Sequence, residues 1–162
     1  MSKKDVCEIL EVLSKQNKNF IVDESFIDFM QNQEGLWPID TQYSNVFLLR
    51  SLTKFYAIPG LRLGYLISTN TTLIARMREL QEPWTINTFA ALAGEIVTQD
   101  QEYALRTHAW VAAEQAFLFQ ALSDFPELSV LKPSANYIFL KNLRSDIQLQ
   151  DALMKQGILI RH

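Results

Sequence analysis

A polar segment between two apolar runs is the feature that most constrains this chain. Residues 46–49 (Val-Phe-Leu-Leu) and 63–67 (Leu-Gly-Tyr-Leu-Ile) have the length and composition of buried strands, and Ser51, Lys54 and Arg62 lie between them. A lysine that follows a buried strand can lose its proton at low cost and attack a carbonyl carbon. A hydroxyl before that lysine and an arginine after it suit a bound phosphate group. The sequence therefore predicts covalent lysine chemistry beside a phosphate site.

The segment from Ser51 to Tyr65 resembles the lysine motif of the fold-type I pyridoxal-phosphate enzymes, which belong to the class I and II aminotransferase superfamily. Within that group it is most similar to the threonine-phosphate decarboxylases, and the histidinol-phosphate aminotransferases are close relatives. Other stretches resemble family segments and follow the family's order: residues 20–29, 82–87, 135–140 and 157–161. The lysine motif is specific, and the other stretches support it.

The resemblance implies an α/β fold with two domains. Residues 1–100 are expected to form part of the cofactor-binding large domain, which has a mixed, mostly parallel sheet with helices. Residues 101–162 are expected to hold the interdomain helix and part of the small C-terminal α+β domain. Because family members are much longer than this chain of 162 residues, we expect a fragment that lacks both ends. The missing parts would include an upstream phosphate-binding turn and the aromatic ring that stacks on the cofactor.

Hydrophobic periodicity and turn residues predict alternating helices and strands. Helices are expected at residues 5–16, 71–81, 88–98, 101–125 and 146–156. Strands are expected at residues 20–22, 46–50, 63–68, 128–131, 136–140 and 158–160. Asn87 is expected to cap the helix after it, Gly157 to close the last helix, and residues 31–44 to form a loop.

The resemblance implies roles for residues around a bound pyridoxal 5′-phosphate. Lys54 would be the Schiff-base lysine, and Asp23 would keep the pyridine nitrogen protonated so that the ring withdraws electrons from the substrate's Cα. Ser51 and Arg62 would bind the phosphate, and Thr53 is a weaker candidate beside them. The structural alternatives are a surface lysine for Lys54, a turn cap for Asp23 and a surface charge or ion pair for Arg62.

Two positions near Asp23 need separate interpretation. Glu24 is its direct neighbour, and strand alternation places the two carboxylates on opposite faces, so only one of them can reach the ring. Similarity to the family selects Asp23. Phe26 replaces a tyrosine of many relatives, whose hydroxyl contacts the cofactor. Since phenylalanine has no donor, a cofactor contact and simple packing in the core are both open for Phe26.

Arg161 and Asn87 are the candidate substrate-binding residues. Arg161 follows the last predicted strand. The resemblance implies that it would contact an anionic group of the substrate. Asn87 could line the substrate side together with Trp84. A terminal surface charge and a helix cap are the alternatives for Arg161 and Asn87.

Composition excludes several classes of function. With 48% hydrophobic and 20% charged residues the chain should be globular, and a net charge of −3 argues against a nucleic-acid surface. One cysteine and two histidines give no metal set with familiar spacing, so no metal is expected. No run approaches the roughly 20 apolar residues of a membrane span, and no secretory signal is visible. A cytoplasmic protein is expected.

The resemblance implies decarboxylation of L-threonine-O-3-phosphate to aminopropanol phosphate in cobalamin biosynthesis, catalysed by a homodimeric parent enzyme. The same residues serve transamination, so a histidinol-phosphate or related aminotransferase remains open. A third interpretation, of another class, is a cofactor-free inactive fragment or partner subunit. We expect the chain by itself to be a poor enzyme or none.

Overall fold

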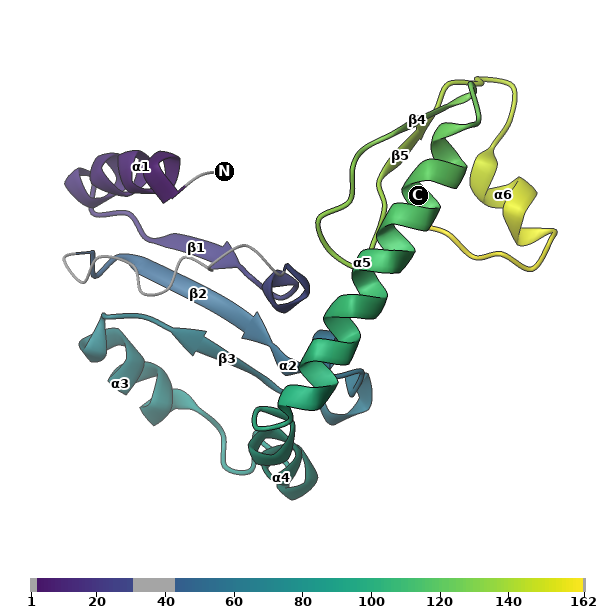
Figure 1. Cartoon of the computed structure of the whole chain (residues 1–162). Helices are drawn as coiled ribbons and strands as arrows, with labels where there is room; N and C mark the ends of the chain where they lie inside the picture. The colour runs from purple at the N-terminus through teal and green to yellow at the C-terminus, as the bar shows by residue number, and fades with distance from the viewer. Residues whose placement is uncertain (1–2, 31–42, 162) are drawn as a thin grey trace. The chain divides into compact units, whose positions relative to one another are not determined.

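The computed structural model describes residues 3–30 and 43–161 (Figure 1). These residues belong to two compact units, Met1–His108 and Ala109–His162. The boundary between the units falls within the long helix α5 (Gln101–Ser123). The domain division after residue 100 stays a prediction.

A three-stranded sheet forms the centre of the first unit. Its strands are β1 (Phe20–Asp23), β2 (Val46–Ser51) and β3 (Gly64–Ile67), in the order β1-β2-β3. β1 and β2 are parallel, and β2 and β3 are antiparallel, so the sheet is mixed as predicted. The parallel register pairs Phe20 with Val46 and Asp23 with Leu49.

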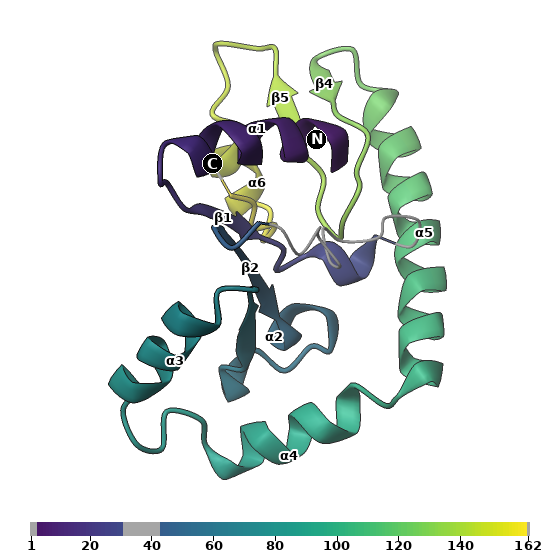
Figure 2. The ribbon, with the colours of Figure 1, turned by 90° about the vertical axis from the view of Figure 1, so that its left-hand side faces the viewer.

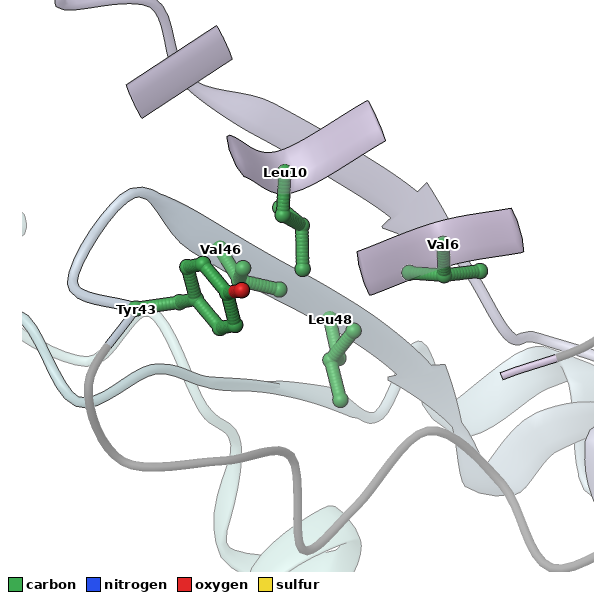
Figure 3. Close-up of a cluster of buried hydrophobic side chains, with 5 residues drawn as sticks. All are labelled: Val6, Leu10, Tyr43, Val46 and Leu48. Atoms are coloured by element: carbon green, nitrogen blue, oxygen red, sulfur yellow. The ribbon is translucent and has the colours of Figure 1, made fainter. Parts of the chain in front are cut away.

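Helix α1 (Lys3–Lys15) lies against one face of this sheet (Figures 1 and 2). Val6 and Leu10 are one helical turn apart, so both side chains point to the same side of the helix. Figure 3 shows them directed towards Val46 and Leu48 of β2, with the ring of Tyr43 beside them. Leu10 is 0% exposed and Leu48 is 1% exposed. This cluster is the hydrophobic core between α1 and the sheet.

Short helices follow the second and third strands. The elements are α2 (Leu52–Phe55), the 3-10 turn η2 (Pro59–Leu61), α3 (Thr71–Leu80) and α4 (Thr88–Val97). A further 3-10 turn, η1 (Ile27–Phe29), follows β1. All the helices and strands predicted for this unit form within about two residues of their expected ends. The predicted loop at 31–44 lies outside the described residues except for its last two positions.

The second unit contains a hairpin and a short helix. β4 (Leu128–Val130) pairs with β5 (Leu140–Asn142) in antiparallel register, and α6 (Leu149–Met154) follows. Val111 on α5 and Ala135 in the hairpin connection are buried. Gln115 Nε2 donates a hydrogen bond to the Ala135 carbonyl oxygen at 2.6 Å. This bond ties the connection to the part of α5 that belongs to the unit.

The second strand of the hairpin was predicted wrongly at residues 136–140. The observed strand is β5, and most of the apolar run before it lies in the irregular connection. Only an isolated bridge joins Ala135 and Tyr137 there, and the Tyr137 and Phe139 side chains are more than half exposed. Composition indicates that such a run can form a strand, but the pairing with β4 determines which residues do.

Two other predictions for this unit were wrong, one in the bounds of a helix and one in the existence of a strand. The last helix begins at Leu149 instead of Asp146, because the Asp146 carboxylate accepts a hydrogen bond from Arg144 Nε at 3.1 Å and the Asn142 side chain bonds the Ile147 carbonyl. Gly157 ends that segment with a φ of 78°, as predicted. Residues 158–160 form no strand, since no ladder partner pairs with them within the described residues.

We predict that Leu10→Ala lowers the free energy of unfolding by about 2–5 kcal/mol, because it opens a cavity in the core between α1 and β2. Urea denaturation measures the change. Val12→Ala on the same helix, at a side chain that is 54% exposed, is the control and should change stability by less than about 0.5 kcal/mol. Equal effects of the two substitutions would contradict this packing.

Candidate functional site

The candidate residues of the first unit gather where the parallel strands end. β1 ends at Asp23, and β2 runs two residues beyond the partner of Asp23 to reach Ser51. α2 then begins at once, which places Thr53 and Lys54 directly after the strand. The carboxyl ends of parallel strands are where α/β proteins bind ligands. Alternation places Asp23 and Ser51 on the same face of the sheet.

A chain of hydrogen bonds connects the hydroxyls to the lysine. The Ser51 and Thr53 hydroxyl oxygens lie 2.8 Å apart, and Lys54 Nζ donates to Thr53 Oγ1 at 3.4 Å. Thr53 is buried, with 4% of its surface exposed, whereas Lys54 is exposed. The structure therefore brings Ser51, Thr53 and Lys54 together as expected. It does not show the burial that would by itself favour a neutral lysine.

Asp23 is an ionised carboxylate beside this lysine. Hydrogen bonds from the Ser25 hydroxyl and the Ser25 backbone N–H hold the pKa of Asp23 below its usual value, and the charge of Lys54 lowers it further. The backbone bond from Ser25 N to Asp23 Oδ1 is 2.9 Å long. Asp23 is exposed, so its carboxylate is accessible to a ligand. Its contact with a pyridine nitrogen stays a prediction.

Glu24 is separated from Asp23 by the alternation of the strand. Its side chain is 5% exposed and accepts a hydrogen bond from Arg50 Nε at 2.7 Å. Breaking a buried ion pair of this kind would leave an uncompensated buried charge, so each partner is held by the other. Glu24 and Arg50 are therefore poor candidates for contact with a ligand, which is consistent with the choice of Asp23 and Arg62.

Arg62 follows the 3-10 turn η2 and has a left-handed backbone, with a φ of 56°. Its side chain is exposed, and Nη1 donates to the Pro59 carbonyl at 3.1 Å. A guanidinium has five N–H donors, so this bond leaves capacity for a phosphate. Pro59 and Gly60 form the turn that precedes Arg62, and the phosphate role of Arg62 stays a prediction.

Phe26 lies beneath the lysine. Lys54 Nζ is 5.9 Å from the centre of the Phe26 ring, and that ring stacks on Phe29 at a centroid distance of 6.2 Å. The position is thus near the candidate site and also part of an aromatic cluster. Both interpretations from the sequence fit this arrangement.

Asn87 acts as a helix cap. Its Oδ1 accepts the Ala90 N–H at 2.9 Å, and its Nδ2 donates to the Leu61 carbonyl at 3.3 Å, next to Arg62. The predicted cap is confirmed, and binding of substrate by Asn87 stays a prediction. Trp84, in the segment before it, has a φ of 60° and is 94% exposed. Arg161 lies in the second unit, exposed and outside any helix or strand, and its substrate role also stays a prediction.

Sequence analysis missed the polar cluster behind the site. Arg50 contacts Asp28 as well as Glu24, and His108 Nε2 lies 2.7 Å from the Asp28 carbonyl oxygen. Burial raises the pKa of Asp28, and the positive charge of Arg50 opposes this. The available signal was a single arginine in an apolar strand beside a strand that ends in two acidic residues.

No helix of the described part is both long and apolar enough to cross a membrane. Among the same residues, no group of three or more histidine, cysteine or acidic side chains is placed to hold a metal ion.

Comparison with known proteins identifies the family. The family model described as "Aminotransferase class I and II" matches residues 1–162. The chain belongs to this family. Enzymes of the class I and II aminotransferase family are pyridoxal-phosphate-dependent aminotransferases and decarboxylases. The predicted α/β fold of the fold-type I enzymes is confirmed, because the chain matches solved structures of this type over about half of their length.

Three relatives show the nature of the similarity. The chain is 48% identical to threonine-phosphate decarboxylase of Salmonella typhimurium over 90% of its residues and 40% of that protein. It is 33% identical to a putative threonine-phosphate decarboxylase of Caldanaerobacter subterraneus, over 98% of its residues and 44% of that protein. The crystal structure of histidinol-phosphate aminotransferase from Clostridium acetobutylicum matches with a TM-score of 0.89 and 31% identity, over 99% of this chain and 49% of that one. The chain thus spans less than half the length of these relatives.

We predict that Asn87→Ala lowers the free energy of unfolding by about 1 kcal/mol through loss of the cap. Asn70, which caps α3 by accepting the Leu73 N–H at 2.9 Å, gives the matched control Asn70→Ala with a similar cost. Asn87→Asp keeps the acceptor and should recover most of the loss. Thermal denaturation of the three variants checks this, and a neutral Asn87→Ala would contradict the capping role.

Proposed function

We propose that this chain carries the lysine, aspartate and phosphate-binding residues of a pyridoxal-phosphate-dependent decarboxylase that acts on L-threonine-O-3-phosphate. The main support is the series of hydrogen bonds that joins Ser51, Thr53 and Lys54. These residues lie at the same strand ends as Asp23. The similarity to threonine-phosphate decarboxylase of Salmonella typhimurium supports this substrate over others.

The donor set fits the cofactor. Lys54 has an exposed amine that can react with the carbonyl of pyridoxal phosphate. Asp23 has an ionised carboxylate that can pair with the ring nitrogen of the cofactor. Ser51, Thr53 and Arg62 offer hydroxyl and guanidinium donors for its phosphate. Arg50 is unsuited to that role, because two carboxylates already engage it. When bound, pyridoxal phosphate supplies an electron-withdrawing ring that stabilises negative charge at the substrate's Cα.

The side chains then have distinct tasks. With the cofactor bound, Asp23 would hold a proton on the ring nitrogen, because hydrogen bonds from Ser25 and the charge of Lys54 lower the pKa of its carboxyl and keep it negative. Lys54 Nζ moves a proton to or from the substrate as general acid or base. Thr53 Oγ1 accepts from Lys54 Nζ and orients it between proton transfers. Arg161 is proposed to hold an anionic group of the substrate, and the orientation of the Cα substituents decides whether carbon dioxide or a proton leaves.

A histidinol-phosphate aminotransferase is the second candidate. The match to the Clostridium acetobutylicum enzyme, at 31% identity and a TM-score of 0.89, favours it. Both candidates use a phosphorylated amino acid or amine and the same lysine. A homodimer of the whole protein is proposed for either, and a cofactor-free role of the chain is the alternative of another class.

The first test is the identity of the reactive lysine. The whole protein that contains this chain is incubated with pyridoxal phosphate, reduced with borohydride and mapped by peptide mass analysis. We expect the label on Lys54 and none in Lys54→Arg. Lys18→Arg, a lysine distant in sequence from the motif, is the control and should label normally. A label elsewhere, or none, counts against the proposed cofactor role.

The second test is the product formed from threonine phosphate by the whole protein that contains this chain. Aminopropanol phosphate and carbon dioxide are expected for the decarboxylase. A keto acid that forms only with 2-oxoglutarate would indicate the aminotransferase instead. Asp23→Asn should lose most turnover with either product, because the ring would withdraw electrons less strongly.

A further inference from the structure

Arg50 makes two ion pairs on the face of the sheet opposite to Asp23 and Ser51. Its Nε donates to Glu24 Oε2 at 2.7 Å, and its Nη1 lies 3.5 Å from Asp28 Oδ1. The side chains are well covered, with exposures of 14% for Arg50, 5% for Glu24 and 30% for Asp28. The planar guanidinium can hold two carboxylates in fixed directions, which a lysine ammonium does not do.

The pair with Glu24 joins two strand ends just where their backbone ladder stops. The parallel register ends at Asp23 and Leu49, and one more backbone bond follows, from Glu24 N to the Leu49 carbonyl at 2.8 Å. The Ser25 N–H then bonds to the Asp23 side chain, so β1 has left the ladder. β2 continues to Ser51 beside β3. The Arg50–Glu24 pair is therefore the side-chain link that spans this junction.

The contact with Asp28 ties a third segment to the same guanidinium. Asp28 lies in η1, two residues after Phe26, whose ring lies beneath Lys54. The Asp28 carbonyl contacts His108 Nε2, which adds α5 to the junction. Asp23, Phe26 and Lys54 belong to three different segments. Arg50 bonds to Glu24, the neighbour of Asp23, and to Asp28, two residues after Phe26. Arg50 itself lies in β2, four positions before Lys54.

We propose that Arg50 is a positioning residue for the candidate cofactor site, which holds the ends of β1, η1 and β2 at fixed spacing from behind the sheet. The effect of Arg50 on cofactor binding rests on the proposed function, whereas the ion pairs of Arg50 do not depend on it. Alternation keeps the guanidinium away from the ligand-facing side. Its effect on a ligand acts through the placement of Asp23 and Lys54.

The decisive measurement needs no cofactor. The carboxyl pKa of Asp23 is followed by carbon-13 NMR in the chain and in Arg50→Lys. The Ser25 bonds and Lys54 lower that pKa, so it reports how the turn after β1 and the lysine are placed. We expect the pKa of Asp23 to rise towards the usual aspartate value in Arg50→Lys. Because lysine keeps the positive charge at position 50, a rise in the pKa of Asp23 reflects a change in geometry and not the loss of a charge.

Matched controls separate positioning from loss of stability. Leu10→Ala weakens the core and should leave the Asp23 pKa unchanged at a pH and temperature where the variant is folded. If Arg50→Lys does not fold, Asp28→Asn is the second variant, because it removes only the ion pair between Arg50 and η1. This variant should also raise the pKa of Asp23. An unchanged Asp23 pKa in the folded Arg50 or Asp28 variant overturns the proposal.

A second measurement links the geometry to the proposed function. Pyridoxal phosphate is titrated into the whole protein that contains this chain and into its variants, and the visible absorbance that disappears in Lys54→Arg is recorded. Arg50→Lys should bind roughly tenfold or more weakly, the order of effect expected from small misplacement of a bound group. Unchanged affinity in that variant also overturns the positioning role. If the unsubstituted whole protein gives no such absorbance, the proposed cofactor role fails, and the Asp23 titration alone decides on Arg50.

Discussion

The parallel pairing of β1 with β2 is the constraint on which the first unit depends. The pairing sets Asp23 opposite Leu49. This register determines where the candidate site residues lie at the strand ends. Two further residues of β2 reach Ser51, and the immediate start of α2 carries Thr53 and Lys54 to the same edge. The core between α1 and β2 holds the ladder from one face. A slip of one residue would exchange the two faces and direct Glu24, not Asp23, towards the lysine.

Much of this arrangement could be predicted from the sequence. Local signals sufficed for the first unit: apolar runs gave the three strands, and Asn87 gave the start of α4, because a side-chain cap depends only on neighbours in the chain. The association of Ser51 with Lys54 was likewise predictable, since both lie within one short segment. The alternation of Asp23 and Glu24 followed from the strand period, and the structure gives each carboxylate different partners.

What the sequence did not reveal depends on long-range pairing. The strand expected at 136–140 shifted because β4 selects its partner residues, and the strand expected at 158–160 has no partner among the described residues. Arg50 was missed because its two carboxylates lie 22 and 26 positions away in the sequence. The exposure of Lys54 could not be predicted from its position after a strand, since it depends on atoms beyond that strand. No local pattern carries this information.

The division of the sheet into two faces has an evolutionary consequence. Exposed residues around Asp23 and Ser51 can be substituted without changing the core cluster or the ion pairs behind the sheet. Substitutions at positions 24, 28 and 50 are coupled instead, because a change in one leaves a covered charge without its complement. One scaffold can thus diversify its chemistry through one side while inheritance preserves the other.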